Sequence, residues 1–218
     1  MKSLLKIALI ICLGVLVATE STAKDGYWQL WNTESLEGDF AENWKVKLEE
    51  EFRFGDNMEE LYYHHTDGGL TYKLTDLFSL GLNYRQIFEK KKGDWKEENR
   101  PHINGTINWQ WRDFAFNDRN RFEYRIRAGK ESVWRYRNKL AITFPVNWTR
   151  FDIEPYLADE VFVDLDEGEF SRNRLYAGFG ALLMKNLEAD IFYLWQSSRK
   201  DEDWIDFNIV GVKLKVKL

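Results

Sequence analysis

Residues 44–54 read WKVKLEEEFRF, and apolar and charged side chains alternate along most of this segment. One face of an extended chain would carry its apolar members, which are Trp44, Val46, Leu48, Phe52 and Phe54. Glu50 is the exception on that face, and the other face carries only lysine, arginine and glutamate. A helix would mix the two sets on every side, whereas a strand separates them. The segment therefore predicts a β-strand with one apolar and one charged face.

The same alternation recurs along the rest of the chain. Clear segments are residues 77–89, 103–112, 119–127, 134–144, 187–196 and 210–218, and weaker ones are residues 61–74, 151–163 and 172–183. Together with residues 44–54 these make about ten strands, with no helical pattern among them. Residues 27–33, from Tyr27 to Thr33, would add an edge strand, a plug or part of a twelve-stranded count, since bacterial single-chain barrels have even strand numbers.

The segments between these strands alternate in length. Short connections are expected at residues 75–76, 113, 146–149 and 184–186, and longer charged ones at 90–99, 128–133, 164–170 and 199–203. Short turns on one side and longer loops on the other are typical of outer-membrane barrels. Seven tryptophans fall near strand ends, where interfacial girdles would need them: Trp44, Trp109, Trp111, Trp134, Trp148, Trp195 and Trp204. We therefore expect an all-β fold, a transmembrane antiparallel up-and-down β-barrel.

The first 23 residues have the pattern of a secretory signal. Lys2 and Lys6 give a positive start, residues 4–17 are mostly apolar, and small residues precede a cut after Ala23. We expect a signal peptide at residues 1–23 and a barrel at residues 24–218, exported to the bacterial outer membrane. The only cysteine, Cys12, lies inside the signal, so the mature chain could form no disulfide and no thiolate metal site.

Composition narrows the class of protein. The formal net charge of −5 argues against nucleic acid as a partner. Aromatic residues make up 16% of the chain, and ten of its residues are tryptophan. A mean hydropathy of −0.53 does not exclude a membrane barrel, because its strands alternate apolar and polar residues. The alternative is a soluble lipocalin-like barrel with its apolar face inward, which would have to pack many bulky aromatic groups inside.

The polar faces of the strands predict a charge network inside the barrel. Its members are Arg85, Arg121, Glu123, Arg125, Arg127, Arg135, Arg137, Glu154 and Arg174. A hairpin closed by residues 128–133 would set Arg127 near Arg135 and Arg125 near Arg137, so carboxylates such as Glu123 must reach these arginines. We interpret the set as ion pairs that fill a narrow lumen; the alternative is a passage or pocket that attracts anions, since arginine offers a bidentate fork.

The sequence offers no pattern for catalysis, cofactor binding or metal binding. His64 and His65 are adjacent, so they would face opposite sides of a strand. Only one of Asp159 and Glu160 can face the lumen for the same reason. No nucleophile–histidine–carboxylate arrangement and no ligand cluster at zinc spacing stands out. We therefore expect no catalytic residue, no cofactor and no metal.

Four tracts resemble the bacterial family called domain of unknown function 2490. They are DRNRFEYR at residues 118–125, WRYRN at 134–138, EPYLADE at 154–160 and RNR at 172–174, and the segment ending EFRF at 51–54 is similar. The resemblance implies an outer-membrane barrel and implies no activity.

These observations predict an outer-membrane β-barrel protein of unassigned activity. It would be non-enzymatic, with a charge-filled lumen, and would act as a structural component or a narrow solute passage. The alternatives are a lipid-directed outer-membrane enzyme and the soluble binding barrel. Expected partners are outer-membrane lipid and the barrel-assembly machinery, which would read the C-terminal strand, here ending in Leu218 where the family norm is phenylalanine.

Overall fold

The computed structural model describes residues 28–146, 152–200 and 203–218, and eleven β-strands account for most of them. The strands are β1 (Trp28–Ala41), β2 (Trp44–Gly55), β3 (Glu60–Lys73), β4 (Phe78–Lys91), β5 (Asp94–Trp111), β6 (Phe114–Arg127), β7 (Val133–Thr143), β8 (Glu154–Asp164), β9 (Glu169–Met184), β10 (Leu187–Lys200) and β11 (Asp203–Lys217). In this part of the chain no helix is long and apolar enough to cross a membrane. The expected signal peptide at residues 1–23 lies outside the described residues.

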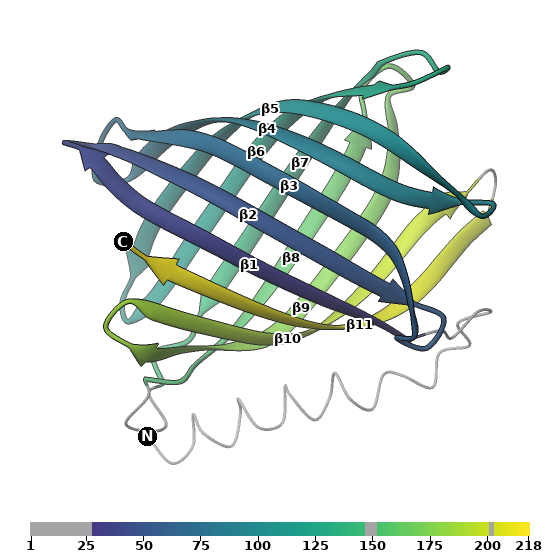
Figure 1. Cartoon of the computed structure of the whole chain (residues 1–218). Helices are drawn as coiled ribbons and strands as arrows, with labels where there is room; N and C mark the ends of the chain where they lie inside the picture. The colour runs from purple at the N-terminus through teal and green to yellow at the C-terminus, as the bar shows by residue number, and fades with distance from the viewer. Residues whose placement is uncertain (1–27, 147–151, 201–202) are drawn as a thin grey trace.

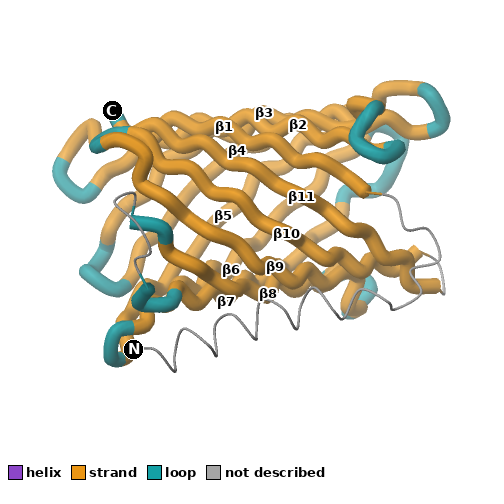
Figure 2. The backbone as a smooth tube through the Cα atoms, turned by 90° about the horizontal axis from the view of Figure 1, so that it is seen from below, coloured by secondary structure: helices purple, strands orange, loops and turns teal. Residues whose placement is uncertain are grey.

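The eleven strands close into one barrel (Figures 1 and 2). Each strand pairs antiparallel with its successor, and β1 pairs parallel with β11, with Trp28 opposite Asn208 and Glu37 opposite Lys217. The expected all-β barrel is confirmed, and its strand count falls between the ten and the twelve that the sequence suggested. The segment from Tyr27 to Thr33, whose role the sequence left open, supplies the start of β1 from Trp28 onward.

Because the number of strands is odd, β1 begins at one open end of the barrel, called mouth B, and β11 finishes at the opposite open end, called mouth A. Mouth A carries the turns at residues 42–43, 74–77, 112–113 and 185–186, and the chain ends there after β11. Mouth B carries the start of β1 and the turns at residues 56–59, 92–93, 128–132 and 165–168.

The expected long loop at residues 90–99 is wrong. Strands β4 and β5 run through it and meet at a two-residue turn, where Lys92 and Gly93 have φ of 53° and 90°. Two successive positive φ values are typical of the type I′ turn, whose twist matches the flanking strands. Charged residues here therefore extend the strands. The segment at residues 199–203 likewise belongs mostly to β10 and β11.

The barrel is apolar outside and charged inside. Leu82 is 65% exposed on the outer face, and Glu123 is 0% exposed on the inner face. Aromatic pairs lie near both mouths on the outer face, such as Trp109 and Phe116 at 5.0 Å near mouth A and Tyr124 and Trp134 at 4.8 Å near mouth B. Among the described residues, buried polar and charged side chains outnumber buried hydrophobic ones. This distribution is the reverse of that in a soluble domain.

An apolar cluster covers the part of the inner wall formed by β1 and β8 to β11. Its buried members are Trp31, Ala158, Tyr176, Phe192, Leu194 and Ile209. The ring of Phe192 lies over Gly211, where a Cβ atom would come within 1.9 Å of the ring. Glycine at this position leaves room for the ring inside the barrel. Charged side chains line the wall on β2 to β7, and others, such as Glu160 of β8 and Arg174 of β9, lie beside the apolar cluster.

Polar side chains interrupt the apolar outer face at several places, where they are hydrogen-bonded to one another. Asn138 donates to Asp118 at 2.5 Å, and Tyr136 donates to Asn120 at 2.5 Å. Elsewhere on the outer face, Thr66 donates to Glu50 at 2.5 Å. Glu50 is the one residue that breaks the apolar face of residues 44–54, and this hydrogen bond gives it a polar partner there. Mutual hydrogen bonds lower the cost of placing polar groups in apolar surroundings.

Candidate functional site: the lumenal charge network

Glu123 of β6 is a centre of the charge network inside the barrel. Its carboxylate lies 2.5 Å from Arg135 and 2.7 Å from Arg137, both on β7. Arg121 and Arg100 approach it at 3.5 and 3.6 Å. The period-two alternation of β5, β6 and β7 turns all five side chains to the same interior. One buried carboxylate thus serves four buried guanidinium groups.

Glu160 of β8 is the second centre. It lies 2.7 Å from Arg137, 2.8 Å from Arg119 and 3.4 Å from Arg174, and the Tyr176 hydroxyl donates to it at 3.0 Å. Arg137 therefore bridges Glu123 and Glu160 with two different nitrogens. Because the two centres share a guanidinium group, the network is continuous from β5 to β9.

Further ion pairs extend the network around the wall. Glu98 accepts from Arg125 through two nitrogens at 2.7 and 2.9 Å and pairs with Arg100 at 2.5 Å. On β3 and β4, Asp67 accepts from Arg85 at 2.7 Å. Two-pronged pairing of this kind fixes the orientation of the guanidinium plane.

The two inward histidines lie beside these carboxylates. His65 Nε2 is 3.3 Å from Glu49, and His102 Nε2 is 3.6 Å from Asp67. His64 faces outward and stacks on Phe88 at 4.9 Å, so the adjacent histidines do face opposite sides. Within residues 28–146, 152–200 and 203–218, no group of three or more histidine, cysteine, aspartate or glutamate side chains could hold a metal ion.

Positive charges exceed negative ones in this network. The inward arginines are Arg53, Arg85, Arg100, Arg119, Arg121, Arg125, Arg127, Arg135, Arg137, Arg172 and Arg174, and the carboxylates that lie among them are Glu49, Glu51, Asp67, Glu98, Glu123, Glu160 and Asp164. In the described part of the chain, eleven guanidinium groups thus face seven carboxylates. Sharing of Glu123, Glu160 and Glu98 between several arginines follows from this ratio.

The structure brings together most of the residues that the sequence singled out. Arg85, Arg121, Glu123, Arg125, Arg135, Arg137 and Arg174 all lie in the network. Arg127 lies at mouth B, half-buried, and its buried Nε has no acceptor. Glu154 is exposed at the start of β8 and forms no ion pair with the described residues.

The expected cross-strand pairs of arginine in the β6–β7 hairpin are wrong. Arg125 lies opposite Val133, Glu123 opposite Arg135, and Arg121 opposite Arg137. The reason is the register: Val133 pairs with Arg125, so Ile126 and Arg127 extend beyond the start of β7 and pair only with β5. Glu123 therefore directly faces an arginine, and Arg125 pairs with Glu98 on β5 instead of with Glu123.

Several network members escaped the sequence reasoning. Glu98 was missed because residues 90–99 look like a charged loop, and Arg100 because the alternation predicts a strand only from residue 103. Glu160 and its neighbour Asp159 face opposite sides, and Glu160 is the one inside, at 1% exposure. The parity of β8, with Ala158 and Phe162 on the same side as Glu160, was the signal that could have found it.

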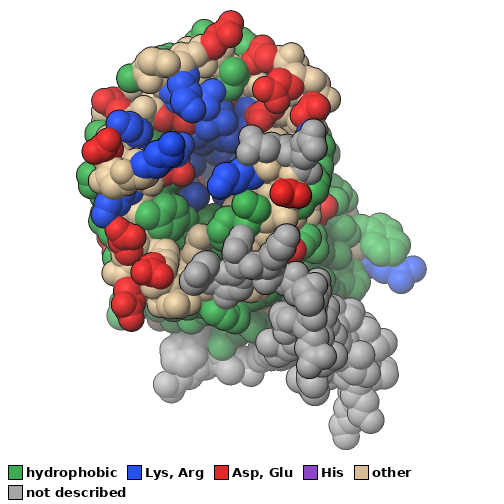
Figure 3. All heavy atoms as spheres, turned by 90° about the vertical axis from the view of Figure 1, so that its right-hand side faces the viewer, with side chains coloured by type: hydrophobic (Ala, Val, Ile, Leu, Met, Phe, Trp, Pro, Cys, Tyr) green, Lys and Arg blue, Asp and Glu red, His purple; other side chains and the backbone are tan. Residues whose placement is uncertain are grey.

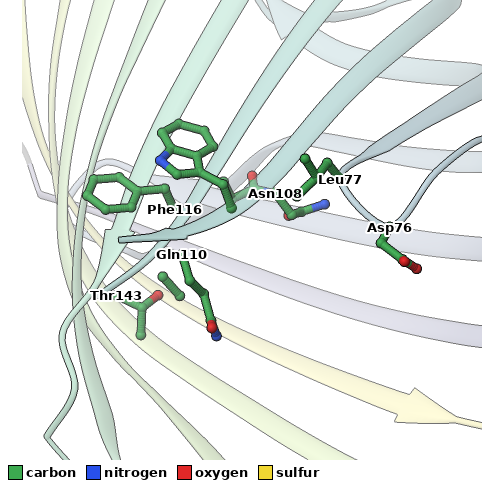
Figure 4. Close-up of a pocket in the computed structure, with 9 residues that line it drawn as sticks. Asp76, Leu77, Asn108, Gln110, Phe116 and Thr143 are labelled. Atoms are coloured by element: carbon green, nitrogen blue, oxygen red, sulfur yellow. The ribbon is translucent and has the colours of Figure 1, made fainter. Parts of the chain in front are cut away.

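The two mouths differ in chemistry. Mouth A holds a pocket lined mainly by uncharged polar and aromatic residues: Asp76, Leu77, Asn108, Trp109, Gln110, Ala115, Phe116, Asn117 and Thr143 (Figure 4). At mouth B, lysine and arginine side chains gather inside the opening and aspartate and glutamate side chains stand around its rim (Figure 3). Mouth A also carries lysine–carboxylate pairs, such as Lys45 with Glu37 and Lys213 with Asp190, whereas mouth B is rich in arginine.

Comparison with known proteins places this barrel in a family. Curated proteins give no match to the chain. A family model described as "Protein of unknown function (DUF2490)" matches residues 28–206, which run from the start of β1 into β11. The match covers most of the chain and nearly all of the barrel, and it agrees with the resemblance carried by the arginine-rich tracts. The chain therefore belongs to the DUF2490 family of proteins of unknown function.

Proposed function

We propose that this chain is a bacterial outer-membrane protein whose barrel crosses the membrane and whose lumen is closed by buried ion pairs. The observation that carries the proposal is the distribution of side chains: large apolar groups such as Leu82 and Ile103 are exposed outside, and carboxylates such as Glu123 are buried inside. Such an outer face is stable in contact with lipid, because water solvates a continuous apolar surface poorly.

The filled lumen favours a structural role over an open channel. Barrels of about eight strands enclose only their own side chains, and sixteen or more leave an aqueous channel, so eleven strands stand near the closed end of this range. Here the apolar cluster around Phe192 faces a wall of linked ion pairs centred on Glu123 and Glu160. We infer that the protein is a non-enzymatic component of the membrane that conducts ions poorly.

The soluble binding barrel fits the same distribution poorly. A lipocalin-like protein keeps its apolar side chains inside to hold a ligand and its charged side chains outside. In this chain the charged face of the alternation is inside, and Leu48, Leu82 and Ile191 are on the outer face. Such an outer face in water would promote aggregation.

Cell fractionation of an expressing bacterium tests the location. We expect the protein in the outer-membrane fraction, with a mature N-terminus at Lys24 by mass spectrometry and with gel mobility that changes on heating. Recovery of the folded protein from the soluble periplasmic extract would contradict the proposal. Export also requires assembly, and β11, which ends close to Leu218, is the strand that we expect the assembly machinery to bind.

Planar-bilayer recording separates the structural role from a passage. We expect conductance far below that of a sixteen-stranded porin measured in the same salt. A stable, porin-like conductance that survives in several preparations would show that the network does not close the lumen, and the structural role would then be wrong.

A further inference from the structure

Arg172 of β9 is a lumenal arginine without a carboxylate partner among the described residues. Its Nε donates to the Ser198 hydroxyl at 2.9 Å, and no acidic group in residues 28–146, 152–200 and 203–218 lies within ion-pair distance. Arg53, Arg125, Arg137 and Arg174 are all close enough to repel it electrostatically. A half-buried charge among four like charges is unfavourable unless an anion neutralises it.

The surroundings of Phe162 show how densely the guanidinium groups are packed. The Cζ atoms of Arg137, Arg174, Arg135 and Arg172 lie 4.4, 4.8, 5.3 and 5.4 Å from the centre of its ring. The ring is almost fully buried, so it acts as a common floor for the four groups. A π-face attracts cations only weakly. Arg135, Arg137 and Arg174 are also paired with Glu123 or Glu160, so Arg172 is the member of this group that has no carboxylate partner among the described residues.

The opening at mouth B leaves this excess of positive charge accessible. Arg172, Arg127 and Arg125 are partly exposed there, and basic side chains are visible inside the opening (Figure 3). The buried Nε of Arg127 lacks an acceptor. At the rim, Glu169 is paired with Arg199 at 2.5 Å and so is already engaged.

We propose that mouth B is a binding site for a phosphate-type oxyanion, held by Arg172 with support from Arg125. Arg125 lies close enough to Arg172 to repel it, and Arg127 at the same mouth lies close to Arg125. A tetrahedral oxyanion accepts several hydrogen bonds at once, and the planar fork of arginine matches its oxygens. Binding would neutralise part of the imbalance of eleven guanidinium groups against seven carboxylates. The anion is either free phosphate or the phosphate of a lipid headgroup, which present the same chemistry. The site needs only the closed barrel and goes beyond the proposed membrane location.

Thermal unfolding in neutral detergent tests the site with inorganic phosphate as the probe. We expect phosphate to raise the melting temperature of the wild-type barrel saturably at constant ionic strength. For Arg172→Gln, the phosphate concentration that gives half of the maximal rise should be at least tenfold higher. Without phosphate, Arg172→Gln should melt above the wild type, because it removes an unpaired charge. The matched control is Arg112→Gln, an exposed arginine in a turn at mouth A, which should respond to phosphate as the wild type does.

A second arm identifies the source of the anion. The same variants are placed in phosphatidylcholine nanodiscs with and without phosphatidic acid, whose headgroup is a phosphate monoester. Stabilisation of the wild type by phosphatidic acid, reduced in Arg172→Gln, would support the site and name the headgroup as ligand. Stabilisation by dissolved phosphate alone would support it with the free anion as ligand. If neither probe stabilises the wild type more than Arg172→Gln, the assignment is overturned, whatever fractionation shows about the membrane location.

Discussion

Replacing Glu123 by glutamine removes one negative charge from the centre of the lumen and keeps the shape of the side chain. Four guanidinium groups contact Glu123, but they do not depend on it equally. Arg137 also pairs with Glu160, and Arg100 also pairs with Glu98. Arg135 has no other carboxylate partner in the described part of the chain, and Arg121 keeps only the amide oxygen of Asn104, at 2.6 Å.

The expected loss of stability follows from these partners. Removing one member of a buried ion pair typically costs about 3–5 kcal/mol, because the charge left behind is buried and uncompensated. Glu123→Gln strands Arg135 and weakens Arg121, so we expect a loss of about 4–5 kcal/mol in the free energy of unfolding, at the upper end of that range. Replacing Arg135 by methionine in the same chain should return part of the loss.

Denaturant unfolding of the barrel in lipid vesicles measures this loss, with fluorescence of the ten tryptophans as the signal. The control is Glu131→Gln, which removes an equal charge from the exposed turn at residues 128–132 and should change little. If Glu123→Gln destabilises the barrel no more than Glu131→Gln, then Glu123 is not the centre of a buried network and the reasoning fails.

Three further substitutions test other parts of the structure. Ile103→Arg should lower stability in lipid by about 2–4 kcal/mol, while the inward-facing Thr106→Arg should lower it less, and equal losses in vesicle unfolding would contradict the inside-out arrangement. Glu50→Leu should stabilise the barrel in lipid by removing a charge from the outer face. A lower midpoint of denaturant unfolding would contradict the prediction that lipid contacts this position. Gly211→Ala should cost about 1–3 kcal/mol through collision with an aromatic ring. Gly180→Ala, where a Cβ atom meets nothing within 4 Å, is its control, and equal melting temperatures would rule out the collision.

The period-two alternation was enough to predict the strands and the class of fold. It is a local signal, because neighbouring side chains on a strand must face opposite sides. The alternation does not indicate which strands pair where the barrel closes, at the seam between β1 and β11. The eleventh strand and the parallel pairing of β1 with β11 therefore could not be predicted from it. It also failed at residues 90–99, because charged residues in a charged lumen are as compatible with a strand as with a loop.

The candidate site was partly predictable for the same reason. Parity along β6 and β7 was sufficient to place Glu123, Arg135 and Arg137 on one face. The partner of each arginine depends on the register between strands, and the register depends on where the turn at residues 128–132 lets β7 begin. A shift of four residues separated Arg125 from its expected neighbours and gave it Glu98 instead. Among the described residues Arg172 has no carboxylate partner, and this depends on strands distant in sequence, so no local pattern could reveal it.

The parallel seam has a consequence for how the barrel is made. Every strand pairing other than β1 with β11 joins neighbours in the chain and can form as a local hairpin. The seam joins residues 28–37 to residues 208–217, so the entropy of closing one very long loop must be met at a single step. Until then the sheet has two free edges, which are templates for pairing with other chains. Assembly should therefore be slowest, and most exposed to aggregation, at closure, and a catalyst that holds both edges would act on this step alone.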